Sequence, residues 1–118
     1  MIKFSGEAVE TETVERCFIT EISNHVDDSD ISIASARVVP GVTTAKHKLV
    51  GVTERYLIFS GLGVVFIDGL EPTQVKSGDV VVIPPGVAQC IENVGASDLI
   101  FYCICTPRFS RDCYRSLE

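Results

Sequence analysis

The stretch GVTTAKHKLVGVTERYLIFSG, residues 41–61, decides the fold and carries the chemistry. Side chains on a strand alternate between two faces, so Lys46 and Lys48 share one face and His47 and Leu49 share the other. Lysine ammonium groups favour water over an apolar interior. We therefore expect His47 and Leu49 to point into the protein.

The second half of this stretch, ERYLIF, places a carboxylate beside that histidine. Glu54 and Tyr56 fall on one face of the expected strand, and Arg55 falls on the other. With Arg55 outside, Glu54 lies inside, where a carboxylate is costly unless it is paired, hydrogen-bonded or bound to a cation. A metal pair and a simple buried hydrogen bond between His47 and Glu54 both satisfy that requirement.

A second stretch, GDVVVIPPGVAQCIEN, residues 78–93, adds a third polar group. After the Pro-Pro-Gly turn, Gln89 alternates with Cys90 and Glu92. A charged Glu92 on the outside places Gln89 inside. The interior is then expected to hold three convergent polar side chains, those of His47, Glu54 and Gln89.

The rest of the chain is dominated by short apolar runs with period two, separated by Gly, Pro and Asp. Such a pattern predicts an all-β sandwich or barrel, with a hairpin at Asp68-Gly69. The tail 109–118 is compatible with one helical turn capped by Ser110. The expected strands are 15–21, 31–39, 44–49, 54–60, 63–69, 79–84, 88–93 and 99–105.

Composition limits the classes of function. The chain has 118 residues and a formal net charge of −6, which disfavours nucleic acid and anionic membrane surfaces as partners. No apolar run has the length of a secretory signal or a membrane span. The five cysteines show no zinc-type spacing, so we expect free thiols in a reducing cytoplasm.

Two strands, 79–83 and 99–105, are apolar on both faces. One face of each is expected to contact the core, which leaves the other face to be covered by another element. A second copy of the chain is the simplest cover. The sequence therefore favours a homodimer.

At these residues the sequence resembles the cupin superfamily of small jelly-roll barrels. The first cupin motif has a glycine, two alternating histidines, a glutamate and a closing glycine, and the second has Pro-x-Gly, a histidine and an asparagine. The matching residues are Gly41, His47, Glu54, Gly61, Gly78, Pro84, Gly86 and Asn93. Leu49 and Gln89 stand where the family has histidines. The resemblance implies a single cupin domain, a jelly roll over residues 1–118 with a short C-terminal tail.

The resemblance also implies a metal held by three histidines and a glutamate. Carried over by position, the candidate ligands are His47, Glu54 and Gln89, which would suit one divalent Mn, Fe, Ni or Zn ion, or the site is metal-free. The candidates for lining the pocket are Leu49, Tyr56, Tyr102 and Arg37.

Several functions remain open from the sequence. One is a metal-dependent isomerase, dioxygenase or lyase acting on a small polar metabolite. Without metal, Glu54 or His47 could move a proton. Another is a non-catalytic barrel that binds a small molecule or acts as a regulatory subunit. A fold analogy does not choose the substrate.

Overall fold

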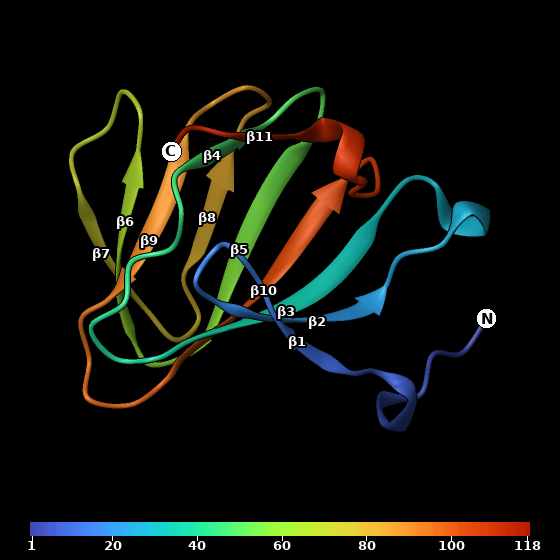
Figure 1. Cartoon of the computed structure of the whole chain (residues 1–118), viewed down its shortest axis with the longest axis horizontal. Helices are drawn as coiled ribbons and strands as arrows, with labels where there is room; N and C mark the ends of the chain where they lie inside the picture. Colours follow the sequence, from blue (N-terminus) through green and yellow to red (C-terminus); the bar gives the residue numbers. More distant parts are fainter.

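The computed structural model describes residues 1–118 and consists of two antiparallel sheets that face each other (Figure 1). The six-stranded sheet has the spatial order β1 (Glu10–Glu12), β2 (Phe18–Ser23), β3 (Ser32–Val38), β10 (Leu99–Thr106), β5 (Thr53–Ser60) and β8 (Val80–Ile83). The five-stranded sheet has the order β11 (Tyr114–Ser116), β4 (His47–Leu49), β9 (Gln89–Asn93), β6 (Leu62–Ile67) and β7 (Thr73–Lys76).

This arrangement confirms the expected all-β jelly roll. Neighbouring strands come from distant parts of the chain, as where β10 pairs with both β3 and β5. The helical segments are three single 3-10 turns, η1 (Ser5–Glu7), η2 (Val26–Asp28) and η3 (Arg111–Cys113). None of them is long and apolar enough to cross a membrane.

The core lies between the sheets and follows the period-two pattern of the sequence. On β5, Glu54, Tyr56 and Ile58 are buried, whereas Leu57 and Phe59 on the alternate face are exposed. Together with β5, strands β3, β6, β7, β8, β9 and β10 supply nearly all of a cluster of 13 buried residues, most of them Val, Ile, Leu or Phe. Burial of these apolar side chains is the main term that stabilises the fold.

Three strands were not expected from the sequence: β1, β7 and β11. They are only three or four residues long, and most of their side chains are exposed, without the alternation of buried and exposed residues that marks a strand in the sequence. The tail does contain one 3-10 turn after Ser110, but the Ser110 side chain makes no capping hydrogen bond. The residues that follow pair with β4, with Tyr114 opposite Leu49 and Ser116 opposite His47.

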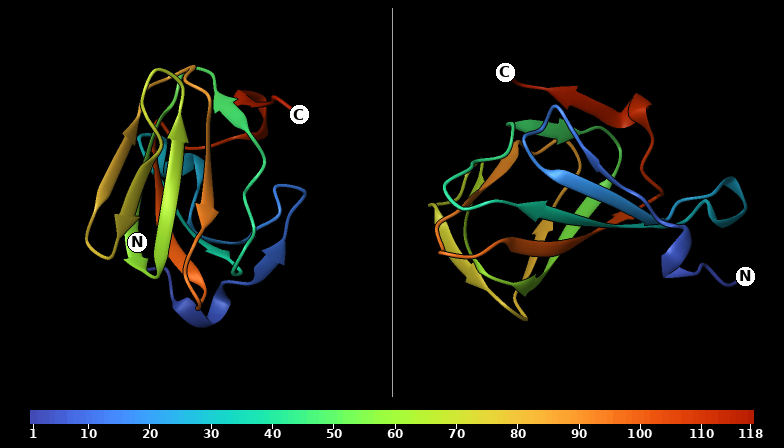
Figure 2. Two further views of the ribbon diagram at one scale, coloured as in Figure 1. Left: turned by 90° about the vertical axis from the view of Figure 1, so that its left-hand side faces the viewer. Right: turned by 60° about the horizontal axis from the view of Figure 1, so that its bottom comes forward.

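The C-terminal segment runs across one end of the sandwich (Figure 2), and side-chain hydrogen bonds hold it there. Arg16 donates two hydrogen bonds of 2.9 Å to the Glu118 carboxylate, and the Lys46 backbone N–H donates one of 2.7 Å to the same group. Strand β11 is thereby tied both to β4 and to the turn between β1 and β2. This placement matters because the interior polar groups lie beneath it.

Asn93, the last residue of the second motif, holds a corner of the fold. It is 1% exposed, its amide nitrogen donates to the carbonyls of Val38 and Ser97, and its amide oxygen accepts from the Gly95 N–H. Three satisfied hydrogen bonds make this a structural residue.

Candidate functional site

A cavity of about 110 Å³ lies between the sheets, beside the C-terminal segment. Its walls come from β2, β3, β4, β5 and β10, the turn before β2 and the residues around η3. Most of the lining is apolar or sulfur-bearing. The polar and charged residues at the wall, apart from two tyrosines, are Glu15, Glu21, Ser32, Thr44, His47 and Glu54.

His47 reaches the cavity from β4 with its ring held on both sides. Its Nδ1 lies 2.9 Å from the Ala45 carbonyl oxygen, which can only accept, so Nδ1 carries a proton and donates it. In the neutral imidazole, Nε2 is then left with a lone pair. The Tyr114 ring stacks on the imidazole at a centroid distance of 5.0 Å.

Glu54 lies next to His47 and is buried, with its Oε1 4.0 Å from His47 Nε2. The Gln89 amide nitrogen donates to Oε1 at 2.6 Å, and the Cys105 thiol donates to Oε2 at 3.7 Å. The Tyr56 hydroxyl donates in turn to the Gln89 amide oxygen. Tyr56, Gln89 and Glu54 thus form one hydrogen-bonded series, in which Tyr56 and Glu54 line the cavity and Gln89 lies behind them.

Burial governs the titration of Glu54. Loss of solvation raises the pKa of its carboxyl, and this outweighs the lowering by His47 and by the hydrogen bond from Gln89. A second carboxyl, that of Glu15, also has its pKa raised by burial, against the lowering effect of His47. Two carboxylates with raised pKa values beside one imidazole are typical of functional sites.

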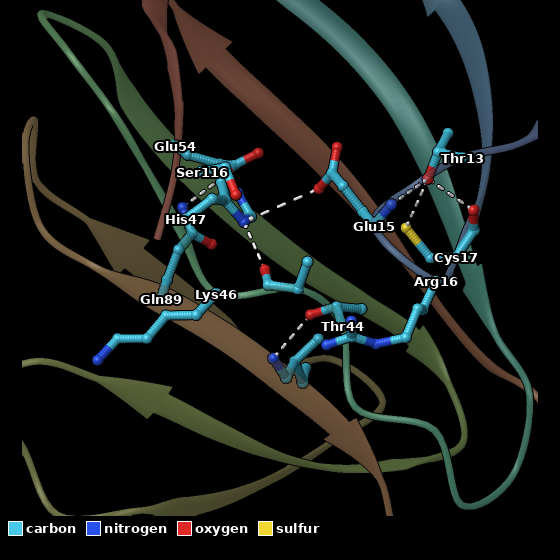
Figure 3. A network of polar contacts seen from close by, with 12 residues as sticks. Thr13, Glu15, Arg16, Cys17, Thr44, Lys46, His47, Glu54, Gln89 and Ser116 are labelled. Carbon is cyan, nitrogen blue, oxygen red and sulfur yellow. Dashed lines mark hydrogen bonds and ion pairs between the residues drawn. The ribbon is translucent and has the colours of Figure 1, made fainter. Parts of the chain in front are cut away.

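Glu15 was not singled out from the sequence. It sits in the turn between β1 and β2, with its Oε2 3.8 Å from His47 Nδ1 (Figure 3). The signal was nevertheless present, because alternation along 15–21 places Glu15 on the same face as Cys17 and Ile19. Both of those residues line the cavity as Glu15 does. Glu15 was missed because it lies in the charged run ETETVER, where a glutamate is expected to be exposed to solvent.

Two of the pocket-lining predictions are wrong. Arg37 points outward, where it pairs with Glu10 at 2.8 Å and with Asp98 at 3.2 Å. Tyr102 lies on the outer face of β10 and packs edge-on against Phe59 at 6.0 Å. Each alternates with an inward-facing neighbour, so each side chain is on the outer face of the sheet.

The remaining predicted site residues either line the cavity or support a residue that does. Leu49 and Tyr56 both line the cavity. Gln89 is 1% exposed and lies behind Glu54, so it supports the carboxylate and does not face the cavity itself. Tyr114 was missed because the tail was not expected to form a strand beside β4. All five cysteines are free thiols, as predicted.

These donors do not fit a metal ion held as in the family motif. Both polar atoms of the Gln89 amide and both oxygens of Glu54 already make hydrogen bonds within the protein. Leu49 cannot ligate, which leaves one imidazole nitrogen. Protein metal sites usually supply three or four side-chain ligands, and no group of three or more His, Cys, Asp or Glu is arranged to hold an ion.

The raised carboxyl pKa values predict how stability depends on pH. Between the ordinary value of 4.5 and the raised folded value, the native state binds more protons than the unfolded state, so stability falls as pH rises. Each unit of difference corresponds to about 1.4 kcal/mol. The pKa of Glu118 is lowered to about 2, so its titration affects stability only at pH values below this range.

We therefore expect the free energy of unfolding to decrease as the pH rises above about 5, and Glu54→Gln to flatten that decrease. Urea unfolding of both proteins across this range measures it. The exposed Glu12→Gln variant should retain the wild-type slope. A wild-type stability that rises over the same range would contradict the assignment.

Comparison with known proteins agrees with this architecture. A family model described as Cupin matches residues 28–111. An uncharacterised protein of Methanocaldococcus jannaschii is 37% identical over 87 residues, 74% of this chain and 69% of that protein. An oxalate-binding protein of Thermotoga maritima is 37% identical over 71 residues, 60% of this chain but only 58% of that protein.

Among solved structures, a nucleoside dehydratase from Streptomyces superposes with a TM-score of 0.84, covering 100% of this chain and 91% of that one. Its sequence identity is 15%, so the likeness extends to the fold alone.

Proposed function

Because the chain belongs to the cupin family, we propose that it binds a small polar metabolite in the cavity between its sheets, with its own side chains in place of a metal. The chain 1–118 would act as a single cupin domain. One observation carries this proposal. Tyr56 donates a hydrogen bond to Gln89, and Gln89 donates one to Glu54, so the side chains at two of the family's ligand positions are hydrogen-bonded to each other.

The cavity has the properties of a small-ligand site. Its volume of about 110 Å³ limits the ligand to about the size of benzene or smaller. A few polar groups interrupt its mostly apolar walls, as in other ligand pockets. His47 Nε2 and the carboxylates of Glu15 and Glu54 are positioned to orient the ligand. The name of the Thermotoga relative, an oxalate-binding protein, also supports binding of a small molecule by this kind of barrel.

The proposal is tested by a thermal-shift screen of metabolites in the presence of a chelator, with mass spectrometry of any ligand released from the purified protein by denaturation. Ala34 lines the cavity, so Ala34→Leu should fill it and abolish the response. Ligands that stabilise both proteins equally would bind elsewhere. Ligands that bind only after metal is added would contradict a metal-free site.

A second candidate is an enzyme that uses acid–base chemistry. His47 Nε2 has a free lone pair, and carboxylates lie within 4.0 Å of either ring nitrogen. An imidazole between two carboxylates can take a proton from one ligand atom while a carboxyl returns one to another, as isomerisation and elimination require. The fold is shared with a nucleoside dehydratase, which catalyses an elimination.

Proton abstraction has a direct readout. A ligand from the screen, incubated with the protein in D2O, should exchange a C–H for deuterium, and the exchange is followed by NMR. Glu54→Gln should slow exchange by about a hundredfold or more while binding persists. Exchange that is equal in wild type and variant would mean that the protein binds the ligand without catalysing proton abstraction.

The metal-dependent alternative, including a dioxygenase, would require Glu54 and Gln89 to give up their present hydrogen bonds.

We also propose that a second copy of the chain covers the outer face of β5 and β8. Leu57, Phe59, Val80 and Val82 are all exposed there, and Val80 lies opposite Leu57 across the two strands. Strand β8 is the edge of its sheet, so a partner can reach this apolar surface without displacing another strand.

Substituting lysine for Phe59 and Val82 together should separate the two copies, because two desolvated ammonium groups are costly in an apolar interface. Light scattering should show twice the 12.8 kDa chain mass for the wild type and 12.8 kDa for the variant. Val14→Lys, at an exposed site on another part of the surface, is the control. A monomeric wild type would contradict the proposal.

A further inference from the structure

The charged side chains at the cavity wall are mainly acidic. Three carboxylates, those of Glu15, Glu21 and Glu54, line it, and no lysine or arginine does. Two basic residues adjacent in sequence to lining residues are paired elsewhere: Arg16 with Glu118, and Lys46 with Asp68 at 3.5 Å. His47 is the only basic group at the wall. The potential inside the cavity is therefore negative once Glu15 and Glu54 are ionised, and a cation in the cavity favours that ionised form.

The hydrogen-bonding groups that remain free at the centre of the cavity are acceptors. The best-placed donors are already used within the protein, because Tyr56 donates to Gln89, Gln89 and Cys105 donate to Glu54, and His47 Nδ1–H donates to the Ala45 carbonyl. The Nε2 lone pair of His47 and the Glu15 carboxylate remain as acceptors. The Glu15 carboxylate makes no hydrogen bond to any side chain.

The two inner carboxylates flank one imidazole. Glu15 Oε2 lies 3.8 Å from Nδ1 and Glu54 Oε1 lies 4.0 Å from Nε2, and both side chains reach toward His47 from different segments (Figure 3). One imidazole can offer at most a single positive charge to these carboxylates, so negative charge is left over, and a second positively charged group in the cavity would relieve it. The aromatic rings of Tyr114 and Phe101 at the wall also favour a cation.

From this arrangement we propose that the cavity selects a small organic cation, a protonated amine on a short apolar chain, and rejects carboxylates. The inference rests on the proposed function and adds the class of ligand. The ammonium group would donate a hydrogen bond to the Glu15 carboxylate, which accepts none from a side chain, and would be attracted by the nearby charge of Glu54. The apolar chain would pack on Ile19 and Phe101. An anion such as oxalate would meet three carboxylates and no fixed cation.

Three probes with the same four-carbon chain isolate the charge: butylammonium, 1-butanol and butyrate. Titration calorimetry at pH 8 in the presence of a chelator should give butylammonium an affinity about tenfold or more above that of butanol, since charge-assisted hydrogen bonds exceed neutral ones. Butyrate and oxalate should give no saturable signal. Butanol binding as tightly as butylammonium, or tighter binding of either acid, would overturn the inference.

Variants locate the selectivity. Glu15→Gln should reduce the preference for butylammonium over butanol by about tenfold, while butanol binding is unchanged, because one carboxylate is replaced by a neutral amide of the same shape. Glu12→Gln, on the exposed strand β1, should leave the preference intact. A Glu15→Gln protein with the full wild-type preference would contradict the assigned role of that carboxylate.

The outcomes also separate this inference from the proposed function. If butanol or butyrate bound more tightly than butylammonium, and Ala34→Leu still abolished that binding, the ligand class would be wrong. The cavity would remain a site for small molecules. No response to any probe would overturn the ligand class, and only a full metabolite screen without a hit would also remove the proposed function.

Discussion

Replacing Gly61 by alanine is expected to lower the free energy of unfolding by about 3–5 kcal/mol. Gly61 joins β5 to β6 with φ +92°, a conformation that costs a residue with a side chain about 1–2 kcal/mol. A Cβ at this position would also lie 2.7 Å from the Asp98 carbonyl oxygen and 2.9 Å from the Leu99 Cα. Both atoms belong to backbone, so β10 would have to move away.

Gly41→Ala provides the matched control. Gly41 has a similar φ of +81°, but a Cβ there would meet nothing within 4 Å. It should cost only the conformational part, about 1–2 kcal/mol. Urea unfolding of the two variants measures the difference, which isolates the contact with β10. Equal losses in both variants would show that the close approach of Gly61 to β10 contributes nothing.

Introducing histidine at positions 49 and 89 together is expected to create a metal site. Leu49 shares a face with His47 on β4, and Gln89 lies opposite His47 across β4 and β9. With Glu54, the variant would present the three imidazoles and one carboxylate of the cupin motif. It should take up close to one Mn, Fe, Ni or Zn ion per chain, and at a hundredfold excess over Kd the ion would stabilise the fold by about 2.7 kcal/mol.

Two controls accompany this variant. Leu49→His alone leaves the Gln89–Glu54 hydrogen bond in place, so it should bind metal much more weakly. Adding Glu54→Gln to the double substitution should also weaken binding, because an amide replaces the anionic ligand. A double variant that folds but takes up no metal would mean that the barrel differs from a metal cupin in more than these two residues.

Much of the fold could be read from the sequence because it depends on alternation. Lys46, Lys48, Arg55 and Glu92 have to face water, and each fixes the direction of its apolar or polar neighbours on the same strand. The eight expected strands and the inward side chains of β4, β5 and β9 follow from this rule. The two motifs supplied the jelly-roll connectivity, which periodicity alone does not give.

What escaped prediction depends on contacts between distant segments. Strand β11 forms because Tyr114, Arg115 and Ser116 meet the free edge of β4, and nothing in the local pattern announces that pairing. Glu15 lies in a turn whose path is fixed by Arg16, at φ 64°, and by the bond from Ala45 N–H to the Glu15 carbonyl. Tyr102 was misplaced because its strand has no charged residue that fixes the facing. For Arg37 the rule that places Arg55 outside would have given the right facing, but it was not applied.

The metal content of the wild-type protein tests the central claim most directly. The protein is purified without chelator, incubated with manganese, iron, nickel and zinc in turn, desalted and analysed by elemental mass spectrometry, with the Leu49→His and Gln89→His double variant as the positive control. We expect far less than one ion per wild-type chain and close to one per chain in the double variant. Near-stoichiometric metal in the wild type, lost in Glu54→Gln, would contradict a site that works through its own side chains.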